Sequence, residues 1–137
     1  MRVYFDSSAF AKRYIDEAGT VEVLEWCERA SELALSIIAV PELISAFRRL
    51  TREGRLNDDQ YRSVKADLLA DIADAIVCDT TPEVIGHAIR AIESHVLRGM
   101  DAIHIGAALA CSAEVFVSAD GRQCDAARAL GLRVIGL

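Results

Sequence analysis

The chain has 137 residues, is 53% hydrophobic with a mean hydropathy of +0.24, and carries a formal net charge of −6. This length suits one domain with a buried core, and so apolar a composition excludes a disordered segment and indicates a surface that a partner covers. No apolar run approaches the ~20 residues of a membrane span, and the negative charge by itself argues against a nucleic-acid binder.

Short apolar segments alternate with helical patterns along the whole chain. Buried parallel strands are predicted at residues 2–5, 33–37, 75–78, 114–118 and 133–136. Helices are predicted over residues 20–30, 41–53, 58–72, 82–96, 100–112 and 121–130. Strands that alternate with helices predict a three-layer α/β/α sandwich, and no domain boundary interrupts residues 1–137.

Local signals define several helix ends and one helix face. Pro41 is expected at the first position of its helix, and Asn57, with Gln60 three positions on, is expected to cap the next one. Ser8 is expected to be a helix N-cap. The helix over residues 82–96 is expected to present an apolar face made of Ile85, Ala88, Ile89, Ile92 and Val96.

The cysteines and the start of the chain bear on the compartment. The four cysteines contain no C-x-x-C pair, so disulfides and zinc are disfavoured. Three of them lie in apolar stretches, so buried free thiols are expected. The first apolar stretch is too short for a signal peptide. These features predict a protein of the reducing cytoplasm.

Four carboxylates follow predicted strands or open predicted helices: Asp6, Glu42, Asp101 and Asp120. Ligands of open parallel sheets bind beyond the carboxyl ends of the strands, where the strand order reverses. Taken singly, each carboxylate is as well explained by helix capping or by a favourable charge at a helix start. Taken together they indicate a cluster that a hard divalent cation would neutralise, and oxygen ligands suit Mg²⁺ or Mn²⁺.

Two further ionisable residues lie near this cluster in the sequence. His104 follows Asp101 by three residues and shares its helix face, and such a pair can bind a metal. A packed, hydrogen-bonded core histidine is the favoured interpretation. Asp125 could join the cluster, but an exposed helix position is favoured for it.

Four stretches resemble, in order and spacing, the successive motifs of the PIN domain, and most closely those of VapC-type toxins. They are VYFDSSAFAKRY, IIAVPELISAF, RGMDAIHIGAAL and VFVSADGRQCDAARALGLRVIGL, and the resemblance runs from residue 2 to residue 137. It implies a single PIN domain with a five-stranded parallel sheet of order 3-2-1-4-5. Asp6 would then lie beside the point where the strand order reverses.

The resemblance also implies a metal-dependent ribonuclease that acts as the toxin of a toxin–antitoxin pair. Asp6, Asp101 and Asp120 would hold one or two Mg²⁺ or Mn²⁺ ions, and Glu42 would bind through water or orient the nucleophile. Ser7 and Ser118 match family positions where a hydroxyl hydrogen-bonds a carboxylate or a metal-bound water. A VapB-type antitoxin and a homodimer are typical partners of the family. The alternative is a PIN-like module that binds RNA or protein and has lost catalysis.

Cationic and aromatic residues suggest where partners bind. Lys12, Arg13, Arg48 and Arg52 could guide RNA phosphates to the site, although solvated helix faces explain them equally well. An aromatic groove for the antitoxin could form from Phe10, Tyr14, Trp26 and Phe47, with core packing as the alternative. A receiver domain or a dehalogenase-type phosphatase is disfavoured, because FDSS carries one acid where the first requires an acidic pair and the second D-x-D.

Overall fold

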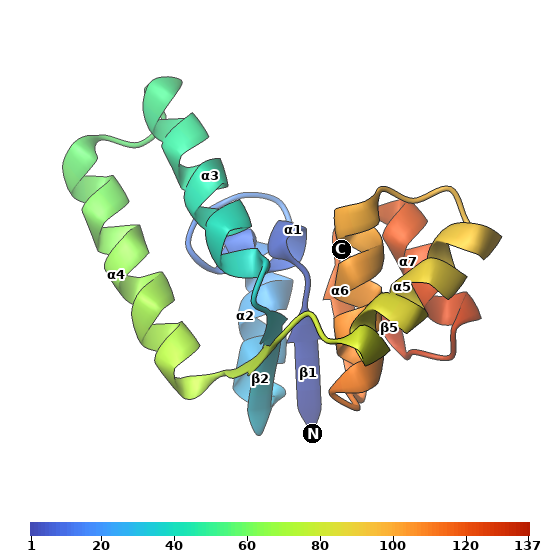
Figure 1. Ribbon diagram of the computed structural model, residues 1–137. Helices are drawn as coiled ribbons and strands as arrows, with labels where there is room; N and C mark the ends of the chain where they lie inside the picture. The colour runs from blue at the N-terminus through green and yellow to red at the C-terminus, as the bar shows by residue number, and fades with distance from the viewer.

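The computed structural model describes residues 1–137 and contains one five-stranded sheet. Figure 1 shows the arrangement of its helices and strands. The strands are β1 (Arg2–Phe5), β2 (Glu32–Ser36), β3 (Ile76–Cys78), β4 (Val115–Ser118) and β5 (Val134–Gly136). All four pairings are parallel, and the order is β3-β2-β1-β4-β5. The predicted strand order is confirmed, and it reverses at β1.

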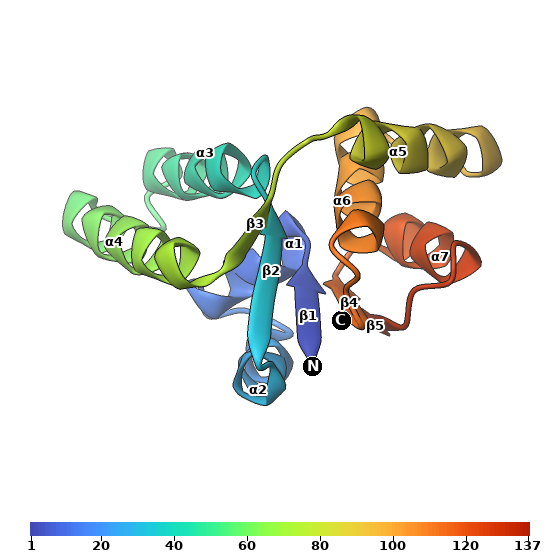
Figure 2. The same cartoon turned by 60° about the horizontal axis from the view of Figure 1, so that its bottom comes forward.

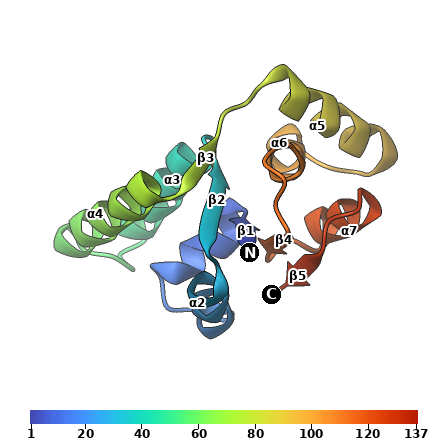
Figure 3. The ribbon, with the colours of Figure 1, turned by 90° about the horizontal axis from the view of Figure 1, so that it is seen from below.

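Helices cover both faces of the sheet. One face carries α1 (Ser7–Phe10), the short 3-10 helix η1 (Ala11–Arg13), α2 (Thr20–Arg29), α3 (Ala39–Arg52) and α4 (Asp58–Asp74). The other face carries α5 (Pro82–Ser94), α6 (Gly99–Ala110) and α7 (Gly121–Ala129). Figures 2 and 3 show the two groups of helices on opposite sides of the strands. The predicted three-layer sandwich is therefore confirmed, and none of its helices is long and apolar enough to cross a membrane.

Side chains of β1 alternate between the two cores, as a strand buried on both faces requires. Val3 and Phe5 pack under α1–α4, whereas Tyr4 packs under α5–α7 and stacks on Phe116 with ring centroids 5.6 Å apart. Burial of each large apolar side chain contributes about 1.5–3 kcal/mol. This packing holds the end of β1 from both sides and so fixes the position of Asp6, the next residue.

The aromatic groove expected for an antitoxin is wrong, and core packing holds instead. Phe10 and Phe47 are fully buried, and Trp26 is 7% exposed. Tyr14 is half-buried and meets Phe10 and Phe47 edge-on, with ring centroids 5.5 and 5.7 Å away. These rings pack α1, η1, α2 and α3 together on one face of the sheet, and only Tyr14 keeps part of its ring at the surface.

The structure confirms one helix start that the sequence predicted and corrects another. Asn57 caps α4 in a complete capping box with Gln60, as predicted. Pro41 is the third helical residue and not the first, because α3 already begins at Ala39. The first four N–H groups of a helix lack intrahelical partners, so a proline is tolerated anywhere in this turn.

The apolar face predicted for α5 is largely outside the core. Of the predicted face only Ala88 is buried, together with Val84 and Ala91. A Cβ on Gly106 of α6 would lie 2.4 Å from the Val84 carbonyl oxygen, so the two helices cross too closely for large side chains. The exposed residues of the predicted face are Ile85 (40%), Ile89 (50%), Ile92 (43%) and Val96 (82%).

All four cysteines are free thiols, as expected. Cys124 is buried, whereas Cys27, Cys78 and Cys111 are only half-buried, so the expected burial holds for one of them.

Candidate active site

The four predicted carboxylates lie around the carboxyl edge of the sheet, at the reversal of strand order. Asp6 follows β1 and Asp120 follows β4, and each accepts hydrogen bonds as the N-cap of the next helix. Glu42 and Asp101 lie in the first turns of α3 and α6. Asp101 lines one pocket with Glu42 and a second pocket with Asp120.

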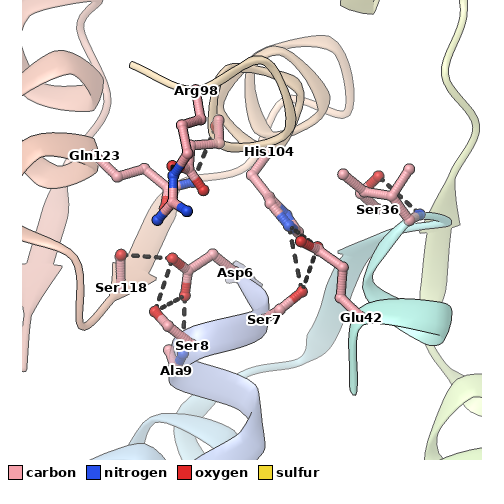
Figure 4. A network of polar contacts seen from close by, with 12 residues as sticks. Asp6, Ser7, Ser8, Ala9, Ser36, Glu42, Arg98, His104, Ser118 and Gln123 are labelled. Carbon is pink, nitrogen blue, oxygen red and sulfur yellow. Dashed lines mark hydrogen bonds and ion pairs between the residues drawn. The ribbon is translucent and has the colours of Figure 1, made fainter. Parts of the chain in front are cut away.

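Asp6 is the buried acid of the group, with 2% of its surface exposed. Its carboxylate accepts hydrogen bonds from the Ser118 hydroxyl at 2.6 Å, the Ser8 hydroxyl at 2.8 Å and the Ala9 N–H at 2.8 Å (Figure 4). Burial raises the pKa of Asp6, and these donors offset part of that rise. The donors fix both oxygens at the end of β1.

Ser8 is not the N-cap that the sequence suggested. Asp6 caps α1, and Ser8 is already the second helical residue. The Ser8 hydroxyl instead donates to both oxygens of Asp6, at 2.8 and 2.9 Å. An ionised carboxylate accepts stronger hydrogen bonds than a hydroxyl, so it is the better partner for the free N–H groups of the helix.

Glu42 is held by a chain of hydrogen bonds that begins in the core. Its Oε1 accepts from the Ser7 hydroxyl at 2.8 Å and lies 2.7 Å from His104 Nε2 (Figure 4). His104 Nδ1 lies 2.8 Å from the Tyr4 hydroxyl. With Nε2–H donating to Glu42, the neutral ring accepts the Tyr4 proton at Nδ1, an assignment that follows from the network.

This network favours the ionised form of Glu42. Burial acts to raise the pKa of Glu42, but the hydrogen bonds from His104 and Ser7 outweigh it and leave the pKa lowered. His104 is 2% exposed, which confirms the interpretation as a packed, hydrogen-bonded core histidine. Ser7 and Ser118 both donate to carboxylates, as expected for them.

Asp101 and Asp120 form the open side of the edge. Burial, and next the charge of Asp120, raise the pKa of Asp101, while Arg98 opposes the rise. The Arg98 guanidinium lies 3.6 Å from the Asp101 carboxylate, and 90% of its side chain is exposed. The buried Gln123 side chain donates to the Asp101 carbonyl at 3.0 Å and thereby ties α7 to the first turn of α6.

Carboxylate oxygens and hydroxyls are the ligands that a hard divalent cation prefers, so the side chains present fit Mg²⁺ or Mn²⁺ in kind. The repulsion of Asp101 by Asp120 is also one that a shared cation would relieve. No three His, Cys, Asp or Glu side chains are gathered closely enough to hold one ion. Asp6 and Glu42 are both turned toward hydrogen-bond donors of the chain itself.

The other predicted site residues lie away from the acids. Lys12 pairs with Glu17 at 3.2 Å, Arg13 with Asp71 at 2.8 Å, and Arg48 lies over the Tyr61 ring at 4.8 Å. Arg52 is exposed at the far end of α3. Asp125 is exposed and pairs with Arg128 at 3.4 Å, which agrees with its favoured interpretation.

Sequence reasoning missed Tyr4, Arg98 and Gln123. Arg98 had a usable signal, because it stands three residues before Asp101 and a helix start puts both on one face. No sequence signal pointed to Tyr4 or Gln123, because their hydrogen-bond partners lie 100 and 22 residues away in the sequence.

Comparison with known proteins places this geometry in a family. The PIN domain model matches residues 3–129. The chain is 31% identical over 134 residues to Ribonuclease VapC45 of Mycobacterium tuberculosis, covering 96% of this chain and 93% of that protein. It is 30% identical over 135 residues to Ribonuclease VapC47 of the same species, covering 94% and 92%.

Solved structures agree with the fold. FitAcB from Neisseria gonorrhoeae matches with a TM-score of 0.73 at 16% identity, covering 98% of this chain and 96% of that one. VapC20 of Mycobacterium tuberculosis, described as a sarcin–ricin loop cleaving toxin, matches with a TM-score of 0.69 at 16% identity, covering 98% and 99%. With its strand order, its edge of carboxylates and these relatives, the chain belongs to the PIN domain family and, within it, to the VapC ribonucleases.

Proposed function

We propose that the chain is a Mg²⁺- or Mn²⁺-dependent ribonuclease that hydrolyses RNA phosphodiester bonds as the toxin of a VapB–VapC pair. The supporting observation is the set of four carboxylates at the strand-order reversal of a PIN fold whose curated relatives are named ribonucleases. We assign Asp6, Asp101 and Asp120 to the metal and Glu42 to the attacking water.

The chain's own groups prepare each acid for its task. The Asp6 carboxylate is held in one orientation by hydrogen bonds from Ser118, Ser8 and the Ala9 N–H. Bound among these acids, a divalent cation would lower the pKa of a water and offset charge on the phosphate. The burial of Asp6 excludes water from its inner side and strengthens electrostatic interactions there.

Glu42 is suited to orient the water rather than to remove its proton. Its Oε1 is engaged by His104 and Ser7, and Oε2 has no hydrogen-bond partner in the chain. A carboxylate with a lowered pKa is a weak base, so its best role is to accept a hydrogen bond and aim the oxygen at phosphorus.

Cleavage of mixed transfer and ribosomal RNA by the purified chain tests this assignment. We expect cleavage with Mg²⁺ or Mn²⁺, none in EDTA, and a loss of at least ~10²-fold in Asp6→Asn and Asp120→Asn. Asp120→Asn is informative because asparagine caps helices as well as aspartate does. Asp125→Asn is the matched control, because this exposed acid of α7 pairs only with Arg128. Cleavage that survives Asp6→Asn would overturn the site.

The inactive PIN-like module stays as the second candidate, because the Asp6 and Glu42 carboxylates are already engaged by hydrogen-bond donors of the chain itself. It predicts that the chain binds RNA or a protein without cutting any RNA in either metal. Tight RNA binding with no metal-dependent product would decide for it.

Partners and compartment complete the proposal. Several solved neighbours are described as VapB–VapC or FitA–FitB complexes bound to DNA, which supports an antitoxin partner for this chain. The exposed isoleucines of α5 support a homodimer. Four free thiols support the cytoplasm.

A further inference from the structure

Each of the three helices that bring Glu42, Asp101 and Asp120 to the edge also brings an exposed arginine. Arg49 of α3 lines a pocket with Glu42. Arg98, the N-cap of α6, lines pockets on both sides of Asp101. The third arginine belongs to α7: Arg122 lines the pocket of Asp101 and Asp120.

We propose that Arg49, Arg98 and Arg122 form a cationic rim that binds the RNA phosphates on either side of the bond to be cleaved. The inference rests on the proposed ribonuclease function and assigns its substrate path. It replaces the path through Lys12 and Arg13, whose charges are already paired.

These three guanidinium groups are available for a ligand. Arg49 and Arg122 are exposed and make no ion pair, and Arg98 makes only the 3.6 Å contact with Asp101. Most other arginines are engaged. Carboxylates pair with Arg2, Arg13, Arg62 and Arg128, and aromatic rings lie beneath Arg29, Arg48 and Arg133. Three of the remaining cations thus lie beside the acids, while Arg52, Arg55, Arg90 and Lys65 lie elsewhere on the surface.

Electrostatics explains why a rim is needed. A phosphodiester carries one negative charge per nucleotide, and four carboxylates at the edge, on a chain of net charge −6, repel it. The divalent cation of the proposed function would offset part of that repulsion at the acids, and cations around them would offset it along the rest of the RNA backbone. Arginine suits the task, because its planar guanidinium binds phosphate oxygens in pairs and stays charged.

The pockets place each arginine at a different point along the bound RNA. The pocket of about 160 Å³ between Arg98 and Arg122 has Asp101 and Asp120 in its wall, so one phosphate there lies beside the metal ligands. Glu42 and Met100 line both the pocket of Arg98 and that of Arg49, which makes the path continuous toward α3. Figure 4 shows the Arg98 side chain directed toward the side of the edge where Asp6 lies.

Salt-dependent binding separates this role from a merely structural one. The probe is a short fluorescent oligouridylate, measured by anisotropy in EDTA so that no cleavage occurs. For single-stranded nucleic acid, each lost phosphate contact lowers the slope of log K against log salt by about 0.7. We expect that fall in Arg49→Gln, Arg98→Gln and Arg122→Gln, with several-fold weaker binding at low salt and unchanged thermal unfolding.

Arg90→Gln is the matched control, because Arg90 is an exposed arginine of α5 that has no carboxylate partner and lines none of these pockets. An equal fall in slope in this control would mean that only net charge matters, and would overturn the rim. Unchanged slopes in the three rim variants, or no binding by the unmodified chain at low salt, would overturn it as well.

Cleavage assays then distinguish failure of the rim from failure of the proposed function. We expect the rim variants to raise KM more than they lower kcat. If the chain binds RNA through the rim but cuts none, the proposed ribonuclease activity is contradicted and the rim proposal stands. If all three rim variants cut RNA with the same kcat/KM as the unmodified chain, the rim proposal is contradicted and the proposed ribonuclease activity stands.

Discussion

His104 Nε2 lies 2.7 Å from Glu42 Oε1, and this contact joins two helices on opposite faces of the sheet. Glu42 belongs to α3 and His104 to α6, so the contact passes around the carboxyl edge where the strand order reverses. The Tyr4 hydroxyl, from the strand between them, lies 2.8 Å from the other ring nitrogen. The position of a site carboxylate therefore depends on polar groups buried in the core.

Tyr4→Phe removes one hydroxyl from this network without changing the shape of the core. His104 Nδ1 then loses its partner in a fully buried place, and we expect a cost of about 1–3 kcal/mol in the free energy of unfolding. Urea denaturation near neutral pH measures it. Tyr61→Phe is the control, because the Tyr61 ring is half-buried and lies under Arg48 through its face. Equal stability changes in the two variants would contradict the network.

Gly106→Ala tests the close crossing of α5 and α6. A Cβ at this position would meet the Val84 backbone oxygen at 2.4 Å, so the helices must move apart. We expect a loss of about 1–3 kcal/mol in stability and lower RNA cleavage, because α6 carries Asp101 and His104.

Gly86→Ala is the matched control on α5, where a Cβ would meet nothing within 4 Å. Alanine favours a helix over glycine by up to about 1 kcal/mol, so this variant should be as stable as the parent or more so. Thermal unfolding of both variants gives the comparison. A stable, fully active Gly106→Ala protein would show that the two helices adapt.

The Arg13–Asp71 ion pair predicts a pH dependence of stability. Burial acts to raise the pKa of Asp71, but the hydrogen bonds from Arg13 and Tyr14 outweigh it and lower the pKa. A lowered pKa means that the ionised form stabilises the fold. The contribution is present above the unfolded carboxyl value of about 3.9 and is lost as the pH falls through the folded value.

Asp71→Asn should therefore destabilise the chain by about 1 kcal/mol near pH 7, since the pair is partly exposed to solvent. The difference from the parent should shrink as the pH falls below about 4. Denaturation at several pH values measures it. Asp67→Asn, an exposed acid one turn earlier on α4 without an ion pair, should show neither effect. If the stability difference between Asp71→Asn and the parent grew on acidification, the lowered pKa assigned to Asp71 would be refuted.

The alternation of strands and helices predicted the three-layer fold, and the positions of the acids after strands or at helix starts predicted the edge where they lie. The strand order came from the resemblance to PIN domains, not from the residue pattern. The residue pattern did not give the partners of those acids. Whether Asp6 or Ser8 caps α1 depends on where Ser118, 112 residues away from Asp6, is folded. The arginines were equally ambiguous, since Arg13 looks as free in sequence as Arg98 until Asp71 of α4 reaches it. Periodicity found the apolar residues of α5 but not which of them faces α6, since Gly106 decides that.

We expect the proposed homodimer to form through the exposed apolar residues of α5. Ile85, Ile89 and Ile92 are 40–50% exposed and lie on neighbouring turns of one helix, a row of the kind that interfaces cover. A lysine at Ile89 places a charge in the centre of that row. Burying it without a partner costs about 3 kcal/mol, or roughly a hundredfold in the dimer Kd.

Light scattering after size-exclusion chromatography measures the outcome. We expect the parent to be a dimer and Ile89→Lys to be a monomer with unchanged circular dichroism. Leu69→Lys is the matched control, because Leu69 of α4 is an equally exposed apolar residue (47%) on the opposite face of the molecule, and it should remain a dimer. A parent that is monomeric alone but loses antitoxin binding in Ile89→Lys would assign the same row to the antitoxin. A dimer that persists in Ile89→Lys would place the contact between copies elsewhere.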